Sequence, residues 1–82
     1  MIYKTHGTCS TAIEVDLAPD HTIRSVRFIG GCNGNTQGIS KLVAGMKAED
    51  VIGKVAGTRC GFRPTSCPDQ LSHALEQALA QL

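Results

Sequence analysis

The residues of this 82-residue chain that are best suited to metal binding or reaction are its four cysteines, Cys9, Cys32, Cys60 and Cys67. Their spacing, C-x22-C-x27-C-x6-C, lacks the tandem CxxC pairs of many zinc sites. Their positions are more informative, because each cysteine falls in a predicted connection rather than in an apolar pattern. A single free cysteine is often just a small buried hydrophobic residue. Four cysteines in predicted turns favour shared metal or redox chemistry instead.

The local surroundings of these cysteines favour the thiolate, which is the form that binds metals and attacks disulfides. Cys32 and Cys67 each precede or begin a predicted helix, where free N–H groups and the helix dipole stabilise negative charge. Arg59 and Arg63 add positive charge beside the last two cysteines.

All four cysteines lie in predicted connections, two of them at helix N-termini. Because connections at one end of a sheet can come together, we expect the four cysteines to converge there. Around one tetrahedral zinc ion their sulfurs would lie roughly 3.5–4 Å apart, given Zn–S bonds of about 2.3 Å.

The sequence gives weaker support for a phosphate, metal or catalytic role of other residues. The glycines around Cys32 match neither GxGxxG nor GxxxxGK[ST], so we interpret them as turn residues. His6 is expected on a strand surface rather than as a replacement ligand, and His73 lies off the apolar stripe of its predicted helix. Arg59 and Arg63 are expected to be solvated loop charges rather than a phosphate site. No nucleophile, base and acid can be assembled, so nothing supports hydrolase chemistry.

Three strands are predicted in the first part of the chain. Apolar residues alternate with polar ones over residues 11–17, as expected for a strand with one buried face. Residues 22–29 form a second β-rich run, in which the apolar phase slips near Ser25 and indicates a bulge. A shorter mixed segment covers residues 2–6. Tight turns between these runs, such as Pro19-Asp20, predict an antiparallel meander.

Three helices are predicted to follow, near residues 35–46, 49–56 and 67–82. Ile39, Leu42, Val43 and Met46 recur at helical spacing and define one apolar face. Gly57 is expected to end the second helix. The third has a continuous apolar stripe, and its start is marked either by Ser66 as N-cap in a capping box or by Cys67 as N-cap before a proline.

The chain is therefore predicted to be one α+β domain spanning residues 1–82, with a three-stranded antiparallel sheet followed by three helices packed on one face. A net charge of +1 gives no electrostatic basis for binding nucleic acid or an anionic membrane. No segment reads as a signal peptide or a membrane span, so the expected compartment is a reducing cytoplasm.

Several motifs resemble those of one known family. The segment TSCPDQL at residues 65–71 is similar to the signature of the TSCPD domain. GTCS at 7–10, FIGGCNGNTQGISKLV at 28–43 and CG at 60–61 also resemble its small four-cysteine members, so the resemblance covers essentially the whole chain. The domain also occurs at the C-terminus of adenosylcobalamin-dependent ribonucleotide reductases, and small members carry the label ribonucleoside-diphosphate reductase.

Reductase catalysis requires a large barrel, which a small α+β domain does not contain. The resemblance therefore implies an accessory module, not catalytic alone, linked to ribonucleoside-diphosphate reduction and DNA synthesis. Its implied partners are a ribonucleotide reductase or the nucleotide that the reductase binds. Its implied cofactor is zinc, with Cys9, Cys32, Cys60 and Cys67 as ligands.

The order of elements also resembles iron–sulfur scaffold proteins, whose three cysteines would match Cys9, Cys32 and Cys67. Thr11 and Ser66 stand where the scaffold has an aspartate and a histidine, and Cys60 is additional. These differences favour a closed four-thiolate zinc site, which is structural rather than catalytic. Two alternatives stay open at this point: an iron–sulfur cluster scaffold or carrier, and a thiol redox protein that uses Cys60 and Cys67.

Overall fold

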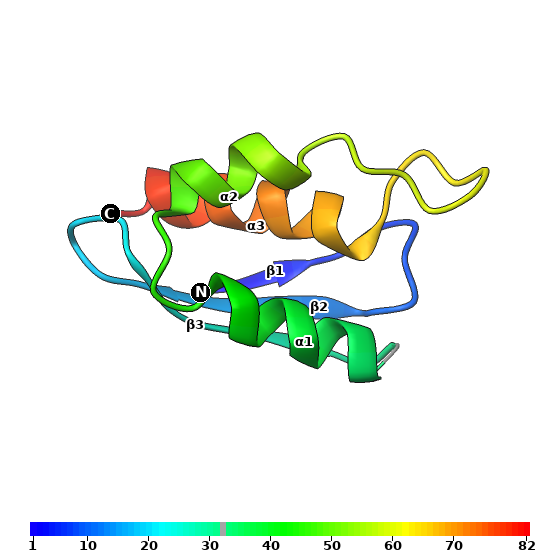
Figure 1. Ribbon diagram of the computed structural model, residues 1–82, viewed down its shortest axis with the longest axis horizontal. Helices are drawn as coiled ribbons and strands as arrows, with labels where there is room; N and C mark the ends of the chain where they lie inside the picture. The colour runs from blue at the N-terminus through cyan, green and yellow to red at the C-terminus, as the bar shows by residue number, and fades with distance from the viewer. Residues whose placement is uncertain (32) are drawn as a thin grey trace.

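The computed structural model describes residues 1–31 and 33–82 (Figure 1). The described elements are β1 (Ile2–Lys4), β2 (Ala12–Leu17), β3 (Ile23–Ile29), α1 (Asn33–Val43), α2 (Ala48–Val55) and α3 (Cys67–Ala80). The strands form one antiparallel sheet in the order β1-β2-β3. The predicted α+β class, with three antiparallel strands followed by three helices, is confirmed.

One face of the sheet is buried, as the alternation in the sequence predicts. Ile13 and Val15 of β2 are almost fully buried, and they pair with Phe28 and Val26 of β3. The register shifts near the start of β3, where Asp16 pairs with Ser25 but Leu17 pairs with Ile23. This irregularity lets Ile23 point into the core although it is an odd number of residues from Val26. The predicted bulge near Ser25 is confirmed.

The helices supply the other half of the core. Helix α3 packs on β2 and β1, α1 packs on β3, and α2 packs on α3. Four residues of the predicted stripe on α3 are buried in the same cluster as the sheet residues: Leu71, Ala74, Leu75 and Ala78. Because these small and branched side chains fill the space between helix and sheet, α3 is held at a fixed position over β2.

Helix α1 is shorter than predicted and its apolar face is different. It ends at Val43 rather than near residue 46, because Gly45 adopts a φ of +89° and donates its N–H to the Ile23 carbonyl. Leu42, which the periodicity placed on the core face, is 77% exposed. The other two helices lie within two residues of their predicted bounds. Gly57, with a φ of +83°, follows the end of α2 as expected.

The connections of the chain divide between two ends of the molecule (Figure 1). The β1–β2 loop, the end of β3, the start of α1 and the α2–α3 loop lie at one end. The β2–β3 turn, the α1–α2 connection and the C-terminus lie at the other. Cys9, Cys60 and Cys67 therefore share one end of the fold. Within the described part of the chain, no helix is both long and apolar enough to cross a membrane.

Candidate functional site

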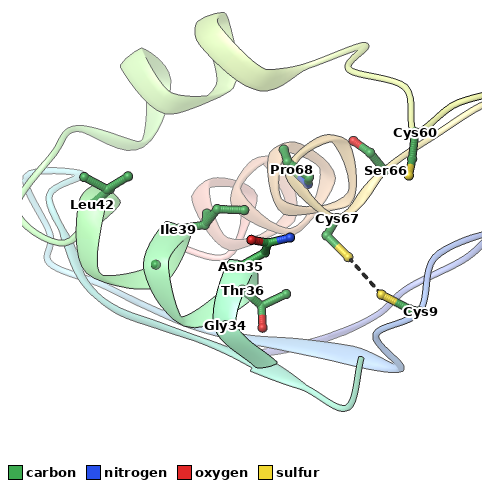
Figure 2. A pocket seen from close by; sticks show the side chains of 11 residues that line it. Cys9, Gly34, Asn35, Thr36, Ile39, Leu42, Cys60, Ser66, Cys67 and Pro68 are labelled. Atoms are coloured by element: carbon green, nitrogen blue, oxygen red, sulfur yellow. Dashed lines mark hydrogen bonds between the residues drawn. The ribbon is translucent and has the colours of Figure 1, made fainter. Parts of the chain in front are cut away.

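Cys9 and Cys67 face each other across the gap between the β1–β2 loop and the start of α3 (Figure 2). Their Sγ atoms are 3.9 Å apart, and neither residue forms a disulfide. This separation is far longer than a disulfide bond of about 2.05 Å. It agrees with the roughly 3.5–4 Å expected between two thiolates on one tetrahedral zinc ion. Cys9 is exposed and Cys67 is half-buried, so a ligand from solvent can reach both.

The start of α3 fixes the position of Cys67. Ser66 is the N-cap residue, and its hydroxyl accepts the Asp69 N–H at 3.2 Å. This settles the choice between the two predicted caps in favour of Ser66, with Cys67 as the first helical residue. The Ser66 hydroxyl also donates to the Thr58 carbonyl at 2.6 Å, which ties the start of α3 to the loop before it. Cys67 therefore sits on a helix terminus whose direction is set by packing and capping together.

Local hydroxyl groups order the turn that carries Cys9. Thr5 and Thr8 both donate their hydroxyls to the Ser10 carbonyl, at 2.5 Å and 3.2 Å. Ser10 is buried, and its own hydroxyl lies 3.4 Å from the Sγ of Cys67. Ser10 was not predicted as a site residue, although its place beside Cys9 in the GTCS motif was the available signal. It provides a second polar contact for the Cys67 sulfur.

Cys60 lies in the exposed part of the α2–α3 loop. Its N–H donates to the Thr65 carbonyl at 3.2 Å, and its carbonyl accepts the Arg63 N–H at 3.0 Å, so it begins a closed turn. Arg59 and Arg63 are exposed, as predicted for loop charges. Cys60 lines a pocket of about 450 Å³ together with Cys9 and Cys67 (Figure 2).

The opposite wall of this pocket comes from α1 and includes Gly34, Gly38 and the exposed Leu42. Apart from adjacent residues and the backbone of α1 itself, no atom of the described residues lies within 4 Å of the position that a Cβ would occupy at either glycine, so the two open that wall. Leu42, which the periodicity assigned to the core, instead borders the pocket that contains the thiols.

The four predicted ligands are brought together only in part. In residues 1–31 and 33–82, no three His, Cys, Asp or Glu side chains are grouped closely enough to hold a metal ion. Cys9 and Cys67 are at ligand spacing, and Cys60 shares their pocket. Cys32 lies outside the described residues.

The residue before Cys32 is packed tightly against the Cys9 turn. Gly31 has a φ of +83°, and a Cβ there would come within 2.7 Å of the Ser10 nitrogen and 2.9 Å of the Cys9 carbonyl carbon. Only glycine fits this contact without a shift of backbone. The chain at Gly31 is therefore held against the turn that presents Cys9, and Gly34 lines the pocket three residues later.

Comparison with family models gives one assignment, in which residues 1–79 match the TSCPD domain. The chain belongs to the TSCPD-domain family. Comparison with curated proteins and with solved structures gives no significant match. The assignment to this family therefore rests on a match over nearly the whole chain. The TSCPD motif, residues 65–69, includes Cys67 of the site.

The motif and the glutamine after it form a buried polar network. Thr65, Asp69 and Gln70 are each at most 9% exposed. The hydrogen bond from the Thr65 hydroxyl, followed by that from the Gly57 N–H, holds the pKa of Asp69 below its ordinary value, and the nearby His73 ring adds to this shift. His73 is exposed, in keeping with its place off the apolar stripe, and its Nε2 lies 3.6 Å from the Asp69 carboxylate. The sequence did not mark Thr65, Asp69 or Gln70 as site residues, although the segment TSCPDQL contains all three.

Proposed function

We propose that this TSCPD domain is a metal-binding module in which Cys9, Cys32, Cys60 and Cys67 hold one zinc ion. The observation that carries the proposal is the 3.9 Å separation between the Cys9 and Cys67 sulfurs, at the spacing of two thiolate ligands on one ion. The donor set fits zinc, because thiolates are among its preferred ligands and four of them complete its tetrahedral shell. Such a site stabilises structure, since it leaves no open position for substrate.

The charges around the site also fit a tetrathiolate centre. Four thiolates on one divalent ion leave net negative charge, which favours nearby cations. Arg59 and Arg63 flank Cys60 in the exposed turn. Because zinc must displace the thiol protons, binding is expected to strengthen as pH rises and to release protons.

We further propose that the module serves ribonucleoside-diphosphate reduction as an accessory, through contact with a reductase or with its nucleotide ligand. The support for this is membership of the TSCPD family together with the resemblance of its motifs to domains attached to such reductases. The domain consists of a three-stranded sheet and three helices, without the barrel that radical chemistry requires. Cys9, Cys60 and Cys67 are thiols rather than disulfides, which suits a reducing compartment such as the cytoplasm.

Metal analysis of the natively purified protein tests the zinc proposal directly. We expect one zinc per chain by elemental analysis, and less after replacement of any ligand cysteine by serine. The Ser72→Ala variant is a suitable control, because Ser72 is buried on α3 but its hydroxyl donates only to the Asp69 carbonyl of the same helix. It should retain full zinc content. Protein that contains no metal, and whose unfolding does not change on addition of zinc, would refute the proposal.

An iron–sulfur cluster is a second candidate for the same thiols. The observation that favours it is the pocket of about 450 Å³ beside the sulfurs, which exceeds the space needed by a single ion. Protein purified without oxygen would then be brown, with iron and sulfide in place of zinc, whereas a zinc–thiolate protein is colourless. Replacing Gly38 by alanine would narrow the pocket without touching a thiol, and should reduce cluster loading more than zinc loading.

A thiol redox function is the third candidate, and here the geometry adds a second pair to the one that the sequence suggested. The sequence suggested Cys60 with Cys67, and the Cys9 sulfur lies 3.9 Å from that of Cys67. In such a reaction the two thiols lose two protons and two electrons to a low-molecular-weight disulfide, which is reduced to two thiols. Mass spectrometry of peptides after mild oxidation would identify which pair forms.

A further inference from the structure

We infer that Thr65, Asp69 and Gln70 are positioning residues that hold the turns of Cys9 and Cys67 at a fixed separation. This inference concerns the same thiols as the proposed function, and its consequence for zinc rests on that proposal. The hydrogen bonds themselves do not depend on a metal. They link the β1–β2 loop to two consecutive segments much further along the sequence, the α2–α3 loop and the first turn of α3.

A continuous chain of hydrogen bonds runs from the β1–β2 loop to a buried carboxylate. The His6 backbone N–H donates to the Gln70 side-chain oxygen at 3.0 Å. The Gln70 side-chain N–H donates to the Thr65 hydroxyl at 3.0 Å, and that hydroxyl donates to the Asp69 carboxylate. All three hydrogen bonds run from donor to acceptor in the same order along the chain, from His6 to Asp69, so each bond polarises the next. The Thr65 hydroxyl must accept from one side and donate to the other, and this fixes its rotamer.

Two residues of this hydrogen-bond chain are close in sequence to the two facing cysteines. His6 is three residues before Cys9, and Thr65 is two residues before Cys67. The β1–β2 loop also packs directly on Thr65, because a Cβ at Gly7 would come 3.0 Å from the Thr65 methyl carbon. Thr65 therefore holds the Cys9 loop by its methyl group and, through Gln70, by its hydroxyl.

The same carboxylate ties down the loop that carries Cys60. The other Asp69 oxygen accepts the Gly57 N–H at 2.6 Å, where the chain leaves α2. At the far end of that loop the Cys60 N–H donates to the Thr65 carbonyl. One buried network thus holds both ends of the loop of Cys60 and sets its position relative to the other two thiols.

A network of this kind does more than add stability, because it determines where the cysteine turns lie relative to one another. Two thiols held together behave as if at high local concentration, and both metal chelation and disulfide formation gain from this. Loosening the network should lower that effective concentration even when the fold persists. A residue that only stabilises the core should not have this effect.

The test measures the effective concentration of Cys9 and Cys67 without metal. In a background with Cys32→Ser and Cys60→Ser, the fraction of Cys9–Cys67 disulfide is measured at equilibrium in glutathione buffers containing a chelator. Thr65→Val keeps the methyl group and removes the hydroxyl, and should lower the effective concentration about tenfold or more. Thr65→Ser keeps the hydroxyl, and should remain within about threefold of the parent. Gln70→Glu keeps an acceptor for His6 but loses the donor to Thr65, and should behave like Thr65→Val.

Ile23→Val is the matched control, because Ile23 is buried and begins β3, next to the β2–β3 turn, which lies at the opposite end of the molecule from the β1–β2 loop (Figure 1). It should lower the melting temperature about as much as Thr65→Val while leaving the effective concentration unchanged within about twofold. All variants are compared at a temperature where circular dichroism shows them folded. If Thr65→Val and Ile23→Val change the thiol equilibrium equally, the positioning role is refuted.

Zinc titration of the four-cysteine protein separates this inference from the proposed function. We expect Thr65→Val to weaken zinc binding by about tenfold and Ile23→Val to leave it nearly unchanged. A protein that shows the thiol effect but binds no zinc would retain the positioning role and refute the zinc site. A protein that binds zinc tightly and shows no effect of Thr65→Val in either assay would support the zinc site and refute the positioning role.

Discussion

The sulfur of Cys9 lies 3.9 Å from the sulfur of Cys67, which is 58 positions further along the chain. Cys9 belongs to the loop between the first two strands, and Cys67 begins the last helix. Such a long-range contact between an exposed thiol and a half-buried one does not arise from apolar packing of the sulfurs themselves. It follows from the core contacts of α3 with β2 and from the polar network around Thr65, which bring the two turns to one place.

Zinc should stabilise this domain against heat, and loss of a ligand should remove most of that gain. Free zinc at about 100 times its dissociation constant adds about 2.7 kcal/mol, or on the order of 10–20 °C for a domain of this size. We expect Cys67→Ser to abolish most of this shift in differential scanning calorimetry. In the presence of a chelator the same variant should melt within a few degrees of the parent. An equal loss with and without zinc would show that Cys67 acts through packing alone.

Replacing Gly31 by alanine should destabilise the fold. Its φ of +83° is unfavourable for a residue with a side chain, and the new methyl group would meet the backbone of Ser10 at 2.7 Å. We expect a cost of roughly 1–3 kcal/mol in the free energy of unfolding, measured with urea. Gly34→Ala is the control, because Gly34 lies in α1 with open space around it and should gain up to about 1 kcal/mol from helix propensity. Two variants of equal stability would contradict this account.

The fold was predictable because its patterns are local. The alternation in β2, the stripe on α3 and the glycine after α2 each depend on residues within one element, and the structure confirms them. The end of α1 was not predictable in this way. Its periodicity continued to Met46, but the Gly45 N–H bonds to Ile23 in a distant strand, which no local pattern records.

The candidate site was predictable at the level of residue type and less so in its contacts. The cysteines indicated thiol chemistry and their place in turns indicated one end of the sheet, and Cys9, Cys60 and Cys67 line one pocket (Figure 2). The sequence did not show which two would face each other, because that depends on how α3 docks on the sheet. Nor did it show that Gln70 reaches the backbone of His6, 64 positions away.

Replacing Ser66 by alanine should destabilise the start of α3 and release the loop before it. The hydroxyl of Ser66 accepts the Asp69 N–H and donates to the Thr58 carbonyl, and both partners would lose a hydrogen bond. We expect a cost of roughly 1–3 kcal/mol in the free energy of unfolding. Ser66→Asp would keep the acceptor for the helix but not the donor to Thr58, and should recover about half. Full recovery by aspartate would mean that only the helix cap matters.

Acid should weaken the domain through Asp69. Hydrogen bonds from the Thr65 hydroxyl and the Gly57 N–H lower the pKa of this carboxyl in the folded protein below its ordinary value of 3.8. Because the folded state prefers the ionised form, the stabilisation is fully present above the unfolded pKa and is lost as pH falls through the folded one. In metal-free protein we therefore expect the free energy of unfolding to fall with pH below about 5.

The Asp69→Asn variant isolates this contribution. It should be less stable than the parent at pH 7, and the difference between the two should shrink as the pH approaches 2, because the parent carboxyl is then protonated as well. Asp20 and Glu49 also have lowered pKa values, the first through the Thr22 N–H and the second through His21, but they are exposed and unchanged in the variant. Their effect therefore cancels in the comparison. Urea unfolding of both proteins at several pH values measures the difference, and a difference that stays constant from pH 7 to 2 would contradict the role assigned to the Asp69 carboxylate.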